Sequence, residues 1–415
     1  MQVSASLPAD SFGDLLARLP ADLDLDALAL QTRAIERKRK IGDGATLLRV
    51  ALARGPGGLS LSQTATWAAM LGMARLSDPA IKFRLDKAGD FLDAIVVCIL
   101  AGKTAGPAVH WPGRVLRVAD GTHVNQPASQ GTDWHIHGVL DLGRGGFSHL
   151  ALTDNHVAES IEHGGPLDGE VRICDRNYAR AGKLRRFRAQ SGNQADFIVR
   201  MSWRAFRLTR PDGGMFDLIA HLEALPQDHA PHEVMVQAAA EPDQPPLPLR
   251  LIIMHRPPDA TEATRRQLVR RAPRKQKKLD ARSLVAAGFV ILATSLPPEG
   301  YPAEAVLAAY RLRWQIELAF KRLKSLLHID HLPTHTPAAS RSWLLAHLIL
   351  ALLCDDLSQD VLESSPLRTS LTKAVRLRCG GCRRPSSSFW SVCSSGRCVC
   401  TGLPTAINTS TDVWP

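Results

Sequence analysis

The order of strand-like and helix-like segments in the middle of the chain constrains its fold more than any other feature. Residues 114–120, 135–142 and 147–153 have strand-like patterns, and the short spacings between them favour antiparallel hairpins. A strand over 171–175, a basic helix over 181–189 and a strand over 195–200 follow. Three strands and then a strand–helix–strand unit predict an α/β fold built on a mixed sheet.

The rest of the chain divides around this core. Residues 1–105 are predicted to be a helical DNA-binding region, in which a helix over about 60–70 and one that starts at Ser77 could form a helix-turn-helix. A plain helical bundle is the alternative. Residues 106–360 then hold an RNase H-like mixed sheet with flanking helices, interrupted by a β-rich insertion over about 201–285. A strand over 289–295, a long amphipathic helix over 302–327 and an apolar helix over 342–357 complete this region.

The last part of the chain, residues 361–415, has a different composition. No acidic residue occurs between Ser364 and Thr411, and serine, cysteine, arginine and glycine dominate there. Such a composition builds no hydrophobic core, so we expect a disordered tail over 378–415 that arose from a frameshift or truncation. The alternative is a zinc knob, because Cys379 and Cys382 have ligand spacing, but no matching pair of cysteines follows.

The charge of the chain limits its partners. Lysine and arginine number 51 against 40 acidic residues, which gives a formal net charge of +11. This excess indicates a polyanion such as nucleic acid, although a basic protein without such a partner is the alternative. The run from Arg265 to Lys278 is a candidate phosphate-tracking segment or a merely solvated one. No basic stretch precedes an apolar one at the N-terminus, and Leu344–Cys354 is too short to span a bilayer, so we expect a soluble protein without a membrane partner.

Three carboxylates stand where the predicted elements could bring them together. Asp120 closes the first predicted strand, Asp175 closes the fourth, and Glu317 lies on the long helix. The first and fourth strands are neighbours in an RNase H-like sheet, so the two aspartates should lie side by side. Clustered carboxylates repel one another unless cations lie between them. Two Mg²⁺ ions roughly 3.5–4 Å apart would offset that repulsion and could activate water or a 3′-hydroxyl.

The helix around Glu317 carries a more specific pattern. Tyr310, Arg313, Glu317 and Lys324 follow one another at spacings of three, four and seven residues, which keeps all four on one helix face. A metal ligand flanked by cations that clamp phosphates would fit this pattern. An ordinary amphipathic helix with ion pairs between successive turns is the alternative.

These residues resemble a known family. The spacing Y-x2-R-x3-E-x6-K is the signature of DDE insertion-sequence transposases of the type named after insertion sequence four, and the chain matches all four positions. Val118–Thr122 resembles the first acidic motif of that family. Ile173–Tyr178 resembles the second, in which Asn177 replaces the usual glycine. The resemblance covers roughly residues 40–357 and includes the β-rich insertion.

The resemblance implies a function and a set of site residues. Asp120, Asp175 and Glu317 would be catalytic metal ligands, and Tyr310, Arg313 and Lys324 would contact transposon-end DNA. The implied reaction is Mg²⁺-dependent cleavage (Mn²⁺ could replace Mg²⁺) at terminal inverted repeats, followed by transesterification into target DNA. We expect a homodimer with DNA in the bacterial cytoplasm, associated with the nucleoid when bound.

Two other functions fit the same sequence. One is a decayed transposase that only binds DNA, and the other is a nuclease that cuts without joining. Trp203 in the insertion could hold a flipped base, although a core tryptophan is the expected alternative.

Overall fold

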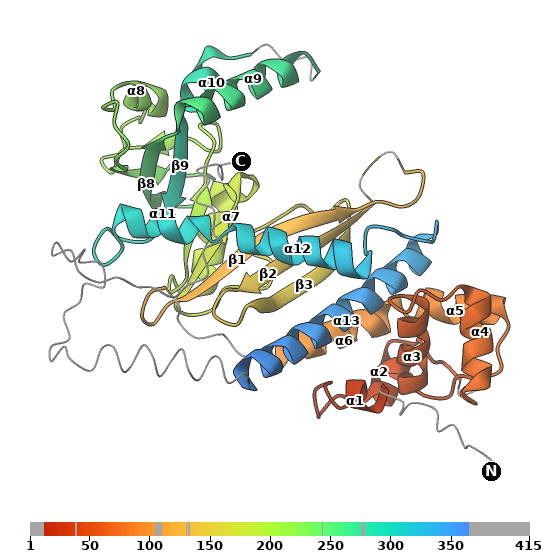
Figure 1. Ribbon diagram of the computed structural model, residues 1–415. Coiled ribbons are helices and arrows are strands. Elements are labelled where there is room, and N and C mark those ends of the chain that lie inside the picture. The colour runs from red at the N-terminus through yellow and green to blue at the C-terminus, as the bar shows by residue number, and fades with distance from the viewer. Residues whose placement is uncertain are drawn as a thin grey trace, which may run out of the picture. The chain divides into compact units, whose positions relative to one another are not determined.

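A computed structural model gives the fold (Figure 1). It describes residues 12–37, 40–103, 110–129, 131, 133–242, 244–274 and 279–364, with side chains described to 270 and 355 in the two helices that end at 274 and 364. The described residues from 12 to 359 belong to one compact unit. The predicted disordered tail over 378–415 and the lysines of the basic run after residue 274 lie outside the described residues.

A single nine-stranded sheet, with strand order β3-β2-β1-β4-β5-β9-β8-β7-β6, organises the core. Its first half is formed by β1 (Val115–Val124), β2 (Trp134–Asp141), β3 (Gly146–Asp154), β4 (Glu170–Cys174) and β5 (Asp196–Arg200). In this half β1, β2 and β3 pair antiparallel, whereas β1–β4 and β4–β5 pair parallel. This topology confirms the predicted RNase H-like mixed sheet.

One detail of the first strand was predicted wrongly. Asp120 does not close β1, because the strand continues to Val124. Residues 120–124 stay in the sheet through their antiparallel partners on β2, after the parallel pairing with β4 has ended at Ala119–Cys174. Asp120 is therefore the first residue of β1 that has a neighbouring strand, β2, on one side only.

The second half of the sheet comes from the insertion and the strand after it. It comprises β6 (Leu208–Thr209), β7 (His232–Ala238), β8 (Leu247–His255) and β9 (Phe289–Thr294). The β-rich character matches the prediction, but this segment also contains helices α8 (Leu218–Glu223), α9 (Pro258–Arg274) and α10 (Ala281–Ala286). Because β9 pairs antiparallel with β5, the insertion extends the central sheet and does not form a separate one.

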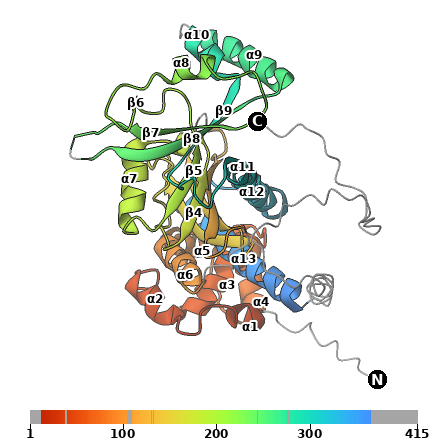
Figure 2. The same cartoon turned by 90° about the vertical axis from the view of Figure 1, so that its left-hand side faces the viewer.

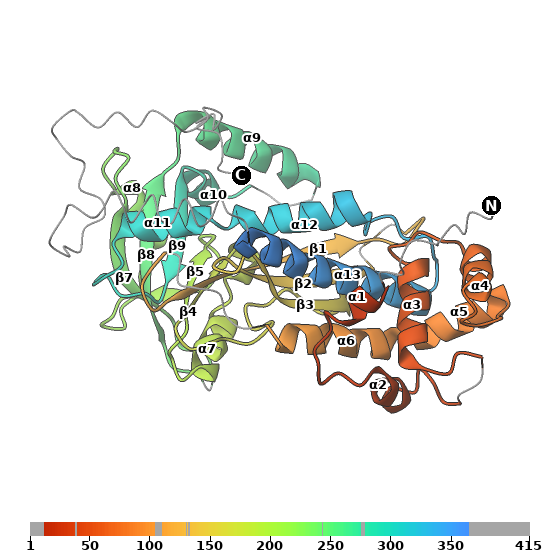
Figure 3. The same ribbon diagram turned by 60° about the horizontal axis from the view of Figure 1, so that its bottom comes forward.

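Helices cover both faces of the sheet. Figures 2 and 3 show α7 (Ala181–Gln190) on one face and α11 (Ala303–Arg311) with α12 (Trp314–Leu327) on the other. The prediction of a single helix over 302–327 was wrong, because the segment divides into two helices at Leu312–Arg313. The amides of residues 312, 313 and 315 bond three residues back, a tighter turn than in an α-helix. The two parts pack on different strands, α11 on β5 and α12 on β1 and β2.

The N-terminal part is helical, as its sequence indicated. Its helices are α1 (Phe12–Leu16), α2 (Leu25–Gln31), α3 (Gly44–Arg54), α4 (Leu61–Met70), α5 (Asp78–Lys87) and α6 (Gly89–Ala101). Ser60 caps α4 through a capping box with Gln63. On α5, Lys82 pairs with Asp86 at 2.5 Å and Lys87 with Glu36 at 2.9 Å. Both lysines of this candidate DNA-binding helix therefore already have acidic partners.

The last described helix, α13 (Pro337–Ser364), joins these helices to the core. Arg341 on α13 bonds to Asp90 and Asp93 on α6, which itself packs on β3. The stretch Pro337–Asp355 is longer than the apolar segment identified in the sequence and would be long and apolar enough to cross a membrane. Since 67% of it is buried inside the protein, it has the surroundings of a core helix.

Candidate active site

The register of the sheet places the two predicted aspartates next to each other. Ala119 on β1 is the parallel partner of Cys174 on β4, so Asp120 and Asp175 are the next residues on two adjacent strands. Neighbouring strands lie about 4.8 Å apart, which sets the scale of the separation between their backbones. At Asp175 the chain leaves the sheet and begins the short helix η1 (Arg176–Tyr178). The pairing predicted from element order is therefore present.

A glycine on β2 lets α12 approach Asp120. Gly138 is the antiparallel partner of Asp120, and a Cβ atom there would lie 2.8 Å from Phe320 and 2.9 Å from Phe147. Any larger residue would force one of these rings to move. Since Phe320 is one turn beyond Glu317, this close packing places Glu317 over the sheet beside Asp120.

Arg313 connects the first and third predicted acids. One of its guanidinium nitrogens, Nη1, lies 3.6 Å from Oδ2 of Asp120, and Nη2 lies 2.6 Å from Oε1 of Glu317. The Arg313 side chain is 12% exposed, whereas that of Glu317 is 50% exposed. The nearby negative charges of Glu317 and Asp175 help to raise the pKa of Arg313 against its burial.

Burial makes the charge of Asp120 unfavourable. It raises the pKa of this carboxyl to about 6, and the negative charges of Glu159 and Asp175 add to the increase. The Gly121 amide, which donates to Asp120 Oδ1 at 2.9 Å, and the cation of Arg313 oppose it. A cation bound beside Asp120 would therefore be attracted by a buried carboxylate whose negative charge is only partly balanced by Arg313.

Tyr310 lies deeper than the other members of the pattern. It is 4% exposed, and its hydroxyl has no hydrogen-bond partner within the described part of the chain. Burial raises its pKa, with a further contribution from the charge of Asp175. A buried hydroxyl without a partner is costly, so a ligand oxygen near Asp175 would satisfy it.

An open cleft of about 490 Å³ exposes part of this arrangement to solvent. Among the predicted residues it is lined by Asp120, Glu317 and Lys324, and Lys321 adds a second cation. Nζ of Lys324 donates to the carbonyl of His123 at 3.3 Å, which holds the lysine at the rim. The structure therefore brings all six predicted residues to one region, with Tyr310 and Arg313 beneath and Lys324 at the surface.

The donor atoms fit a hard divalent cation, although the acids do not yet surround one. Carboxylate oxygens are the ligands that Mg²⁺ prefers. Among the described residues, no three His, Cys, Asp or Glu side chains converge closely enough to hold a metal ion. In this arrangement Glu317 is bonded to Arg313, so the guanidinium supplies the positive charge that the two acids require.

A fourth acid at the site was missed from the sequence. Glu159, in the loop between β3 and β4, accepts a hydrogen bond from the side chain of Asn177 at 3.3 Å. Its Oε1 is 2.9 Å from where a Cβ of residue 121 would stand. No periodic pattern marks a loop glutamate, and only the position of Asn177 in the second motif could have indicated a special contact.

The histidines near Asp120 form a cluster of their own. The rings of His123 and His135 are 4.3 Å apart, and those of His137 and His163 stack at 4.1 Å. Burial and neighbouring histidines lower the pKa of His137 to about 3. Burial therefore keeps the His137 ring neutral near pH 7.

Two further features lie away from the acids. Trp203 packs against the core of the insertion, and its indole NH donates to Ser283 at 3.2 Å. Two arginines stand over its ring, and these contacts support a role as a core tryptophan over one in holding a flipped base.

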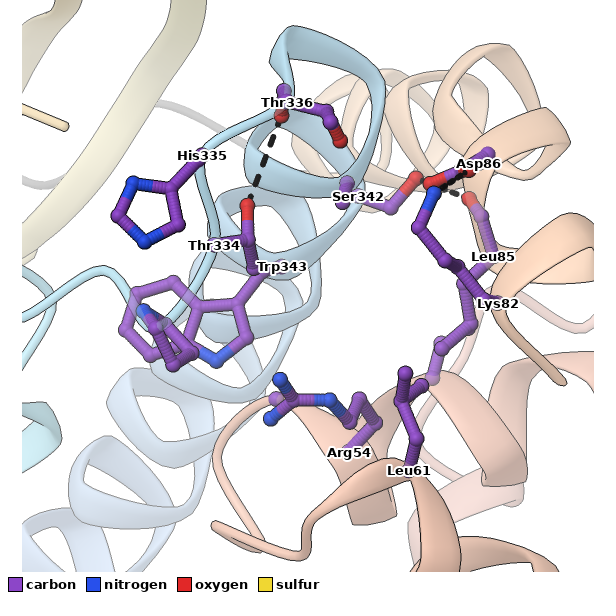
Figure 4. A pocket seen from close by; sticks show the side chains of 14 residues that line it. Arg54, Leu61, Lys82, Leu85, Asp86, Thr334, His335, Thr336, Ser342 and Trp343 are labelled. Carbon is purple, nitrogen blue, oxygen red and sulfur yellow. Dashed lines mark hydrogen bonds and ion pairs between the residues drawn. The ribbon is translucent and has the colours of Figure 1, made fainter. Parts of the chain in front are cut away.

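Figure 4 shows a mostly apolar pocket of about 270 Å³ between the N-terminal helices and α13. Arg54 and Trp343 face it, and none of the predicted site residues lines it.

Comparisons with known proteins place this geometry in a family. Residues 111–353 match the transposase DDE domain family. The putative transposase InsL of insertion sequence IS186 from Escherichia coli is 37% identical over 359 residues, which are 86% of this chain and 96% of that protein. The transposase for insertion sequence element IS421 from Escherichia coli is 37% identical over 360 residues, with the same coverage.

A solved structure is also similar. The cryo-EM structure of the piggyBac transposase synaptic complex with hairpin DNA covers 85% of this chain and 76% of that chain, at 10% identity and a TM-score of 0.43. The family match spans more than half of the chain and includes Asp120, Asp175 and Glu317. The chain therefore belongs to the transposase DDE domain family.

Proposed function

We propose that the chain is an insertion-sequence transposase of the type named after insertion sequence four, and that it cleaves the element's ends and joins them to target DNA. The observation that carries this proposal is the convergence of Asp120, Glu317 and Lys324, which are distant in sequence, on one open cleft. Asp175 is joined to the same site by the register of β1 and β4.

Each residue has a separate task in this proposal. Asp120, Asp175 and Glu317 would hold two Mg²⁺ ions, with Mn²⁺ as a substitute, which supply activation of water or a 3′-hydroxyl and stabilisation of the leaving oxygen. Tyr310 would donate its unpartnered hydroxyl to a phosphate of the terminal repeat. Arg313 and Lys324 would neutralise phosphate charge, the first from beneath the acids and the second from the rim of the cleft.

The partners follow from the reaction. The protein would bind terminal inverted repeats and target DNA, and joining two ends would require at least a homodimer. It would act in the bacterial cytoplasm, on the nucleoid when bound.

The test removes the charge of Glu317, the acid in the Y-x2-R-x3-E-x6-K pattern. Glu317→Gln keeps the size of the side chain but should lower metal occupancy and abolish Mg²⁺-dependent cleavage of end DNA, while binding in a gel-shift assay survives. Glu304→Gln, which changes an exposed acid in the first turn of α11, is the matched control and should cleave like the wild type. Cleavage by Glu317→Gln at the wild-type rate would reduce Glu317 to an ion-pair partner of Arg313.

Two assays separate the rival functions. A decayed, binding-only protein would shift end DNA but never nick it in the presence of Mg²⁺. A nuclease that cuts without joining would nick the ends but fail to insert pre-cleaved ends into a target.

A further inference from the structure

The side chain of Glu159 lies between the two segments that carry the aspartates. Its Oε2 accepts the amide of Asn177, two residues after Asp175, at 3.3 Å. Its Oε1 lies so close to Gly121 that a Cβ atom there would be 2.9 Å away. The carboxylate thus touches the chain just after Asp120 and just after Asp175.

The loop that carries Glu159 is fixed to the core. Lys183 on α7 donates to the carbonyl of Glu159 at 3.1 Å. Arg172, which is fully buried on β4, donates to loop carbonyls at 2.6–2.7 Å, namely those of Ile161, His163 and Gly165. Arg186 holds Glu162 of the same loop at 2.8 Å. The position of the Glu159 backbone is therefore determined by the core and not by solvent-exposed contacts alone.

The residues that meet Glu159 are suited to this contact. Gly121 leaves room for the carboxylate, and Asn177 supplies an amide donor at the position where the family's second motif has a glycine without a side chain. Within the described part of the chain no cation forms an ion pair with Glu159. Its negative charge therefore helps to raise the pKa of nearby Asp120. The departure from the motif and the extra acid thus belong to one structural feature.

We propose that Glu159 is a positioning residue of the carboxylate site, which fixes the segments after Asp120 and Asp175 against each other and strengthens the binding of a divalent cation between them. This inference rests on the proposed function. Outer partners of metal ligands commonly change metal affinity by about 10–100-fold when they are removed.

The experiment measures Mn²⁺ binding to the full-length protein by calorimetry, without DNA, so that the result does not depend on activity. Glu159→Ala should weaken binding by about 10–100-fold. Glu159→Gln retains an acceptor for Asn177 but loses the charge, so it should recover part of that loss. Glu162→Ala, which removes an equal charge from the same loop but faces Arg186, is the matched control and should bind like the wild type.

A double variant tests the contact itself. Asn177→Gly should weaken Mn²⁺ binding less than Glu159→Ala does, and the two changes together should cost no more than Glu159→Ala alone, because they remove the same contact. Thermal unfolding of each variant identifies any loss of folding. If Glu159→Ala does not fold, the Mn²⁺ affinity of Glu159→Gln is compared with that of the wild type instead.

The outcomes distinguish this inference from the proposed function. If Glu159→Ala and the wild type bind Mn²⁺ equally while the wild type cleaves end DNA, only the role of Glu159 is overturned. The same holds if Glu162→Ala weakens binding as much as Glu159→Ala does, since the loop would then act as a whole. A wild-type protein that neither binds Mn²⁺ nor cleaves would overturn both.

Discussion

Arg313 lies between the carboxylates of Asp120 and Glu317, 3.6 Å from Oδ2 of the first and 2.6 Å from Oε1 of the second. The arginine stands where β1 and α12 meet, at the break between α11 and α12. In this structure the positive charge of Arg313 balances the negative charges of Asp120 and Glu317. DNA phosphates and divalent cations would compete for these partners, because phosphates attract the guanidinium while cations attract the carboxylates.

Replacement of this arginine should therefore affect DNA binding first. Arg313→Ala is expected to weaken binding to end DNA and to reduce the slope of log affinity against log salt by about one, the effect of leaving one phosphate without its cation. Gel-shift titrations at several salt concentrations measure both quantities. Arg322→Ala, an exposed cation on α12 that does not line the cleft, is the control. Equal effects of the two changes would place Arg313 in a purely structural role.

The pKa of Asp120 gives a prediction about stability. Since burial raises it from 3.8 to about 6, the charged carboxyl opposes folding, and the metal-free protein should lose stability as pH rises from 3.8 to about 6. A shift of roughly two units corresponds to an upper limit of about 3 kcal/mol. Asp120→Asn should thus be more stable than the wild type at about pH 7.5 but not at about pH 4.

Urea unfolding in the presence of a chelator measures this difference at the two pH values. The same variant should not cleave DNA, which would separate the stability of the site from its activity. An Asp120→Asn protein that is no more stable than the wild type at the higher pH would show that the carboxyl is adequately solvated or paired.

Buried histidines should make the protein sensitive to acid. Burial lowers the pKa of His137 to about 3 and of His149 and His347 to about 4, all below the usual 6.5. Below pH 6.5 the unfolded chain takes up protons that the folded protein excludes, so stability falls by up to about 1.4 kcal/mol per pH unit for each histidine. This loss continues until the folded-state pKa values are reached.

His347→Gln tests one of them, because its effect on stability should shrink as the pH falls from about 6.5 towards 4. Unfolding curves across this pH range supply the measurement.

The role of the basic run from Arg265 to Lys278, which begins within α9, stays a prediction from the sequence. Replacement of Arg274, Lys275, Lys277 and Lys278 by alanine should weaken binding to all DNA sequences alike and reduce the salt slope by about one for each phosphate that is no longer neutralised. Arg266→Ala is the control, since Arg266 pairs with Glu262 at 3.8 Å on α9 itself. An unchanged slope in the quadruple variant would place the run on a solvated face.

The sequence by itself determined the α/β class and the order of the elements from β1 to β5, and it marked the three acids and their flanking cations as candidates. These features are local, since strands and helices reveal themselves by periodicity, and the spacing of Tyr310, Arg313, Glu317 and Lys324 is fixed within one short stretch of chain. The roles of these residues in metal and DNA binding stay predictions.

Only the tertiary structure decided how the pieces meet. The continuation of β1 past Asp120 depends on its pairing with β2, and the union of the insertion with the central sheet depends on β5 pairing with β9. No glycine or proline marks the helix break at Leu312–Arg313, whose two sides pack on different strands. Glu159 reaches Asn177 across 18 residues of chain, and Phe320 reaches Gly138 across a far longer span. Such contacts arise from packing between distant segments, which leaves no periodic pattern in the sequence around either partner.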